Sequence, residues 1–185
     1  MVDINPSDSE LIRRAIAGET DAFGALYERY MTDIYRYIYF RLGNARVSED
    51  LTGTVFLRVW ESLDRFQPDR ISFRSWLYRV AHNLLVDRYR TQKPVDRLDD
   101  FTLHDRQPDP EHRLIDDEES RMLAKAISRI KPEYQEVVSL RFISELNHAE
   151  TARIMERSEG AVRVLQHRAL EALRRSLGQA AKKDS

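Results

Sequence analysis

Hydrophobic side chains recur along most of this chain of 185 residues at the spacing of an α-helix. The pattern is clearest from Ser72 to Arg90, where a rotation of about 100° per residue places five apolar side chains on one side. A stripe of this width seats a helix on a hydrophobic core. The five side chains are Phe73, Leu77, Val80, Ala81 and Leu84.

Three more helices are predicted before this one. Gly18 stops a short first helix, and Thr20 caps a longer second helix that Gly43 ends. Ser48 opens a third helix, whose apolar residues follow one another at a strict spacing of four. The Asp and Pro content of residues 64–72 predicts a loop, which leads into the helix described above. The four helices predict a compact N-terminal domain of residues 1–92.

The next segment, residues 93–119, has three prolines, many acidic residues and no sustained period. This composition predicts a flexible acidic linker. His104, Asp105 and His112 lie within it, but isolated His and Asp side chains in such a segment are usually solvated rather than ligands of a metal. We therefore expect neither a metal site nor a cofactor here.

The C-terminal segment, residues 120–185, predicts a second small helical domain. Pro132 suits the first position of a helix, and Asn147 with Glu150 forms a capping-box pattern before a short helix. Ser158 caps another helix almost at once, with Gly178 expected past its end. Two helices joined by so tight a turn indicate a helix-turn-helix. In the helix that begins at Pro132, the expected inward residues are Tyr134, Val137, Val138 and Phe142.

The formal net charge is −1, which by itself argues against a nucleic-acid partner. The distribution of the charges reverses this interpretation. Residues 93–120 hold four basic and ten acidic side chains, whereas residues 121–183 hold thirteen basic and seven acidic ones. A basic C-terminal part is typical of a nucleic-acid-binding module, and we expect the acidic linker to compete for it in the free chain.

A polar row lies beside the apolar stripe of the Ser72 helix. Its members follow one another at spacings of three or four, so they form one ridge along the helix. An aromatic face, two guanidinium groups, an amide and a carboxylate suit stacking on bases, neutralising phosphates and binding base edges. A solvated polar face is the alternative. The ridge residues are Trp76, Arg79, Asn83, Asp87 and Arg90.

The last helix has its own buried row, predicted to be Val162, Leu165, Ala169 and Leu173. Outward residues near its N-terminal half can enter a major groove, where Arg pairs with guanine and Val touches a thymine methyl group. Arg168 and Arg174 are better placed to bind phosphates. A basic helix that binds a protein is the alternative. The outward or flanking residues are Arg163, Val164, Gln166 and His167.

Several classes of protein are disfavoured by what the sequence lacks. There is no Cys, which rules out disulfides and thiolate chemistry and fits a reducing compartment. Clustered carboxylates, a Gly-rich phosphate loop and a nucleophile motif are also lacking, so we do not expect an enzyme. The first residues have no leader pattern, and no apolar run reaches membrane-spanning length. We expect a cytoplasmic protein that does not insert into a membrane.

Four segments resemble, in order and spacing, regions two and four of bacterial extracytoplasmic-function (ECF) sigma factors. They are DAFGALYERY, EDLTGTVFLRVWESLDRF, SFRSWLYRVAHNLLVDRYR and the stretch 123–177. The resemblance implies an all-α protein of two small domains, a helical bundle and a helix-turn-helix, joined by the linker. It also implies a detachable subunit that recognises two promoter elements and opens the duplex. The implied partners are core RNA polymerase, promoter DNA and an anti-sigma factor.

The resemblance further implies roles for individual residues. The ridge, with Arg74 and the loop 64–74, would bind the downstream element and its extruded base. Arg163, Val164, His167 and Arg168 would contact the upstream element. The surface facing the polymerase would comprise Asp50, Leu51, Phe56, Arg58 and Trp60.

The chain departs from the family pattern at two places. Gly53 and Thr54 stand where the family commonly has Gln followed by Glu or Asp, so either the polymerase contact is altered or the helix bends there. In the last helix, Val164, Leu165 and Gln166 replace a commoner Ser-Arg-Leu, which moves the buried residue one position earlier. This shift amounts to about 100° of helix rotation and affects the implied base contacts.

A stand-alone repressor or activator is the main rival interpretation. Such a protein would use the helix-turn-helix as a dimer on a palindromic site, with the N-terminal bundle as a sensor. No heptad pattern indicates a dimerisation helix.

Overall fold

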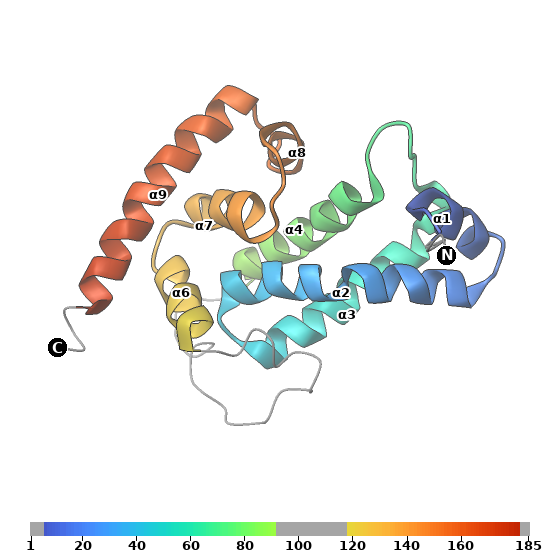
Figure 1. The fold of residues 1–185 in the computed structure, drawn as a ribbon, viewed down its shortest axis with the longest axis horizontal. Helices are drawn as coiled ribbons and strands as arrows, with labels where there is room; N and C mark the ends of the chain where they lie inside the picture. The colour runs from blue at the N-terminus through green and yellow to red at the C-terminus, as the bar shows by residue number, and fades with distance from the viewer. Residues whose placement is uncertain (1–5, 92–117, 182–185) are drawn as a thin grey trace, which may run out of the picture.

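The computed structural model describes residues 6–91 and 118–181, and in these ranges every regular element is helical (Figure 1). The predicted all-α fold class is therefore confirmed for the described residues. The linker, with His104, Asp105 and His112, lies almost wholly outside them.

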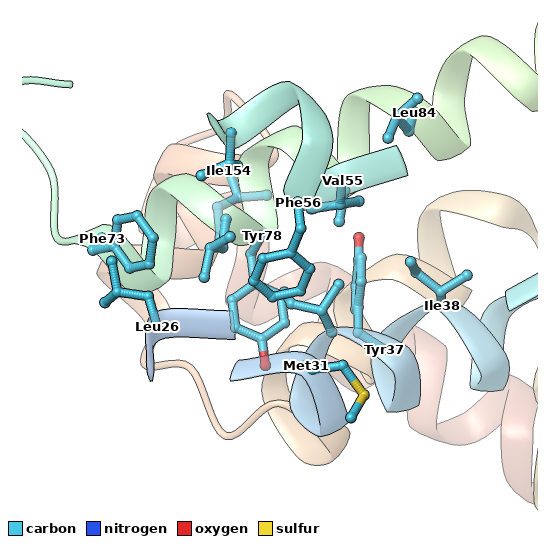
Figure 2. Packing of buried hydrophobic residues seen from close by; sticks show 14 of the residues in the cluster. Leu26, Met31, Tyr37, Ile38, Val55, Phe56, Phe73, Tyr78, Leu84 and Ile154 are labelled. Carbon is cyan, nitrogen blue, oxygen red and sulfur yellow. The ribbon is translucent and has the colours of Figure 1, made fainter. Parts of the chain in front are cut away.

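The N-terminal part is a bundle of four helices: α1 (Asp8–Ile16), α2 (Thr20–Leu42), α3 (Ala45–Glu61) and α4 (Phe73–Thr91). The predicted stripe of α4 is buried in the bundle except for Val80, which is partly buried. Figure 2 shows how α2, α3 and α4 fill the core with apolar side chains, among them Leu26, Val55 and Phe73.

The C-terminal part contains α6 (Glu118–Ser128), α7 (Pro132–Val138), α8 (His148–Ile154) and α9 (Glu159–Ala181). The helix α7 continues directly into a π-helical turn, Ser139–Ile143. Pro132 occupies the start of α7 as predicted. The capping box at the start of α8 is also present, because the Asn147 side chain accepts from the Glu150 amide while the Glu150 carboxylate accepts from the Asn147 amide, each over 2.9 Å.

Four predictions about the helices were wrong. Glu19, rather than Thr20, is the N-cap of α2, and no side chain caps that helix. Asn44, rather than Ser48, caps α3, because its side-chain oxygen accepts from the amide of Val47 over 3.0 Å. Gly178 lies within α9 instead of past its end, since one glycine costs a helix only about 1 kcal/mol. Phe142 falls in the π-helical turn and is 46% exposed rather than inward.

The two parts pack directly against each other through α2. Near its C-terminal end, Tyr35, Tyr39 and Phe40 are buried in the hydrophobic cluster of the C-terminal part. In return, Leu140, Leu146 and Ile154 join the cluster of the N-terminal bundle, where Figure 2 places Ile154 close to the bundle side chains. The placement of one part on the other, which the linker left open, is thus defined by shared apolar contacts.

Buried polar groups accompany this contact. Arg41 on α2 donates to the hydroxyl of Tyr37 over 3.3 Å, and its guanidinium carbon lies 5.7 Å from the ring centroid of Tyr89 on α4. Between α4 and α7, His82 and Glu136 approach at ion-pair distance, although their geometry is not that of an aligned hydrogen bond. The boundary is therefore partly polar, as is usual between domains of one chain.

Candidate nucleic-acid interface

The α4 ridge begins at a well-defined helix start. The hydroxyl of Ser72 accepts from the amide of Ser75 over 3.2 Å, which satisfies one of the free amides of the first turn. Burial of the apolar stripe then fixes the rotation of α4. As a result Arg79, Asn83, Asp87 and Arg90 are exposed, and Trp76 is partly exposed. The polar ridge predicted from the sequence is present on the surface.

A cleft of about 330 Å³ lies at the N-terminal end of this ridge. Phe66 stacks on Trp76 with ring centroids 4.9 Å apart and forms its aromatic wall. Four guanidinium groups line the same cleft, three from the bundle and one from α8. Aromatic faces next to cations suit a single-stranded nucleic acid, which offers bases to stack and phosphates to bind. The arginines are Arg65, Arg70, Arg79 and Arg153.

Two arginines of α4 are engaged by the C-terminal part. Arg74 donates to the backbone carbonyl oxygen of Ser144, and its guanidinium carbon lies 5.7 Å from the ring centroid of Tyr78. Arg79 forms an ion pair with Glu156 over 3.0 Å. Arg74 is therefore partly buried at the boundary, whereas Arg79 keeps an exposed side chain.

The helix-turn-helix is built from α8 and α9. The hydroxyl of Ser158 accepts from the amide of Ala161 over 3.2 Å at the start of α9. Val162, Leu165 and Ala169 are buried as predicted, and Leu173 is partly buried. This burial leaves Arg163, Val164, His167 and Arg168 exposed along α9, with Val164 51% exposed.

Gln166 is less free than its neighbours on α9. It is partly buried, and its side-chain oxygen accepts from Nε of Arg141 over 3.0 Å. Arg141 also donates to the carbonyl oxygen of Leu146, just before α8. Arg141 thus links the segment before α8 to α9. This role was not predicted from the sequence, because nothing in the local pattern pairs residues 141 and 166.

The residues assigned to a polymerase surface are not equally accessible. Asp50, Arg58 and Trp60 are exposed on α3 and Leu51 is partly buried. Phe56 is only 3% exposed and packs edge-on against Tyr27, with centroids 4.8 Å apart. Phe56 can therefore support such a surface from beneath more readily than it can contact a partner.

An apolar depression of about 360 Å³ adjoins these residues. Trp60 packs edge-on against Phe23 with centroids 4.8 Å apart, and Leu57 is 57% exposed beside them. Leu57 was not predicted to belong to a partner surface. Its position three residues before Trp60, on the same face of α3, is the signal that would have found it. The depression is lined by Thr20, Phe23, Phe56, Leu57 and Trp60.

Within residues 6–91 and 118–181 no group of three or more His, Cys, Asp or Glu side chains could hold a metal ion. No helix among the described residues is both long and apolar enough to cross a membrane. The notable surface features in these ranges are thus the α4 ridge with its cleft, the exposed face of α9 and the apolar depression.

Comparison with protein families defines the class of this chain. Sigma-70 region 2 matches residues 26–95, which include α3 and α4. Sigma-70, region 4 matches residues 126–175, which include α8 and most of α9. The chain is 39% identical to the ECF RNA polymerase sigma factor BldN of Streptomyces coelicolor over 91% of its own length, and it spans 65% of that relative. It is 32% identical to the ECF RNA polymerase sigma factor SigW of Bacillus subtilis, covering 90% of this chain and 94% of SigW. This chain therefore belongs to the ECF RNA polymerase sigma factors.

A solved structure supports the same assignment. The structure of CnrH in complex with the cytosolic domain of CnrY is 26% identical, with a TM-score of 0.66, covering 96% of this chain and 99% of that chain. The similarity extends over both modules and supports the same all-helical fold for them.

Proposed function

We propose that this chain is a promoter-specificity subunit that binds core RNA polymerase, directs it to promoters with two elements and helps to open the duplex. One observation carries the proposal: a single chain of the ECF sigma family presents two separate basic surfaces suited to DNA, the α4 ridge and the exposed face of α9. Two such surfaces on two modules suit two elements on one duplex.

The α4 ridge and its cleft would bind the downstream element. Bases leaving the duplex lose stacking worth a few kcal/mol per step, and this loss must be offset where they bind. Trp76 offers an aromatic face, Asn83 an amide that can pair with a base edge, and Arg79 a charge for the phosphates. Asp87 and Arg90 extend the same surface towards the end of α4.

The exposed face of α9 would bind the upstream element as duplex. Arg163 and Val164 lie near the N-terminal end of α9, where a recognition helix usually contacts base edges. His167 and Arg168 follow one turn later and can bind bases or phosphates. The exposure of Val164 and burial of Leu165 support this choice of residues over a face rotated by one position.

The polymerase would dock on α3. Asp50, Arg58 and Trp60 are exposed there, and Leu57 with the apolar depression adds hydrophobic area. Interfaces commonly combine such an apolar centre with a polar rim. Leu51 and Phe56 would support this surface from within the bundle.

In this function the chain would catalyse no reaction itself and would need no cofactor. It would act in the cytoplasm, beside the transcribing polymerase. We include an anti-sigma factor among its partners, because the related CnrH is found in complex with the cytosolic domain of CnrY.

In vitro transcription tests the proposal. Purified chain is mixed with core RNA polymerase from the same cell and a library of randomised promoters, and run-off products are sequenced. We expect products that depend strictly on this chain and share two sequence elements. A specific shift of a palindromic DNA by the chain alone, with no polymerase-dependent product, would instead support a stand-alone repressor or activator.

A further inference from the structure

The α4 ridge is partly occupied by the C-terminal module of the same chain. Glu156, in the turn between α8 and α9, pairs with Arg79 over 3.0 Å. Arg153 of α8 lines the same cleft as Trp76, and Arg74 donates to the carbonyl oxygen of Ser144. The helix-turn-helix therefore lies against the groups to which the proposed function assigns the downstream element.

The backbone of Glu156 is unusual for this residue type. Its φ is 53°, in the left-handed region that glycine and asparagine adopt with less strain. The turn follows the C-terminal end of α8, where the amide of Arg157 donates to the carbonyl oxygen of Ala152 over 2.9 Å. The backbone alone would thus favour Gly or Asn at position 156. What the glutamate adds is a carboxylate within reach of Arg79.

We propose that Glu156 is an intramolecular competitor of DNA for the α4 ridge, its carboxylate holding the guanidinium of Arg79 where a phosphate of the downstream element would bind. This inference rests on the proposed function. Nucleic acid must displace Glu156 to gain Arg79, and separation of the modules releases both partners. The free chain consequently binds single-stranded DNA less tightly than its ridge alone would allow.

The exposure of the pair sets the size of the effect. The side chain of Arg79 is 47% exposed and that of Glu156 is 76% exposed, so solvent screens their attraction. Closure of the modules rests on the shared apolar contacts, and Glu156 adjusts access to the ridge by a small factor. The cleft keeps Arg65, Arg70 and Arg153 besides Arg79, which lets a phosphate compete with one carboxylate.

The test uses the full chain with Glu156→Asn, which removes the carboxylate and suits the left-handed backbone. Binding is measured by fluorescence anisotropy with a labelled single-stranded DNA 20-mer of mixed sequence. We expect Glu156→Asn to tighten binding by about two- to fivefold, the factor that an exposed ion pair contributes to an equilibrium constant. Its thermal midpoint should equal or exceed that of the unchanged chain.

Two controls separate competition from a general change of charge. Glu133→Gln removes the same charge from another exposed pair, with Arg157 at 3.5 Å within the C-terminal module, and should leave binding unchanged. In an Arg79→Ala background, Glu156→Asn should bring no gain. An equal gain from Glu133→Gln, a gain that persists without Arg79, or no gain from Glu156→Asn overturns the inference.

Run-off transcription with the unchanged chain keeps the two proposals apart. If transcription depends on the chain but Glu156→Asn binds DNA no better, the competition fails and the proposed function stands. If no transcription is seen while Glu156→Asn shows its gain only with Arg79 present, the contact competes with nucleic acid but the proposed function fails.

Discussion

Arg41 and Tyr37, one turn apart on α2, form a buried polar pair in which the guanidinium donates to the phenol oxygen over 3.3 Å. The pair lies where the N-terminal bundle meets the C-terminal module, and the ring of Tyr89 covers the guanidinium from α4. Because both groups are almost fully buried, the protonation state of the Tyr37 phenol is linked to the stability of the fold.

The first prediction concerns alkaline pH. Burial raises the pKa of Tyr37 above its ordinary value near 10, and burial likewise raises the pKa of Tyr30 and Tyr78. Above about pH 10 tyrosine ionises in the unfolded chain while the buried phenol stays protonated in the folded chain. The free energy of unfolding is therefore unaffected by the ionisation of Tyr37 below about pH 10 and falls as the pH rises above it. We expect the urea midpoint to fall above about pH 10, and Tyr37→Phe to reduce the slope. An unchanged slope in Tyr37→Phe would contradict the link.

A second prediction concerns Gly53 in the middle of α3. The helix runs without interruption from Ala45 to Glu61, and a Cβ at position 53 would meet no atom within 4 Å. Gly53→Ala should therefore stabilise the chain by about 0.5–1 kcal/mol, measured by urea unfolding. Gly18→Ala is the control, because its φ of 98° makes any side chain strained. Stabilisation by both changes would contradict the role given to the positive φ of Gly18.

Asn83 provides a third prediction. It is exposed on the α4 ridge, so Asn83→Ala should leave the fold and polymerase binding intact while weakening promoter opening by about 1–3 kcal/mol, the worth of a good contact to a base edge. Permanganate reactivity of promoter thymines measures opening, and gel filtration with core polymerase measures binding. Loss of polymerase binding in this variant would refute the role assigned to Asn83.

Arg163 on α9 gives a fourth prediction. If it reads a base, Arg163→Ala should weaken upstream binding by about 1–3 kcal/mol and relax the preference at one position only. Arg174 is exposed further along α9. Arg174→Ala should weaken binding to all sequences alike and reduce the slope of log affinity against log salt concentration by about one. Binding by the polymerase complex to a set of single-base promoter variants distinguishes the two. Uniform weakening in both would make Arg163 a phosphate contact.

The fifth prediction concerns the apolar depression. Leu57 is 57% exposed beside Trp60, so Leu57→Glu should change stability little but lower the affinity for core polymerase by about tenfold or more. Met122→Glu is the matched control, because Met122 is a 52% exposed apolar residue on α6. Equal affinities for the two variants, measured by competition for polymerase, would place the docking surface elsewhere.

Local patterns predicted most of this architecture. The stripe and ridge of α4, Pro132 at the start of α7 and the capping box of α8 depend on side chains within one or two helical turns of each other. Periodicity and capping chemistry report such relationships directly. The exposed face of α9 followed in the same way from the burial of Val162 and Leu165.

The contacts between distant segments could not be predicted in this way. Tyr35 and Tyr39 are buried by the C-terminal module, so α2 has apolar residues around most of its end and its pattern does not show which partner covers which side. The ion pair of Arg79 with Glu156 joins residues 77 positions apart. Phe56 was assigned to a partner surface through the family resemblance, which does not show which side of α3 the bundle covers, and its ring is buried.

The C-terminal end of α2 packs against both modules, and this has a consequence for how the chain behaves in solution. When the modules part, Tyr35, Tyr39 and Phe40 lose the cover that α6 and the π-helical turn Ser139–Ile143 provide. We expect an opened chain that has bound no partner to self-associate through these exposed rings, and to do so more at higher protein concentration. We therefore expect the burial of these rings between the two modules to limit self-association of the free chain, and a binding partner of the opened chain to cover them in turn.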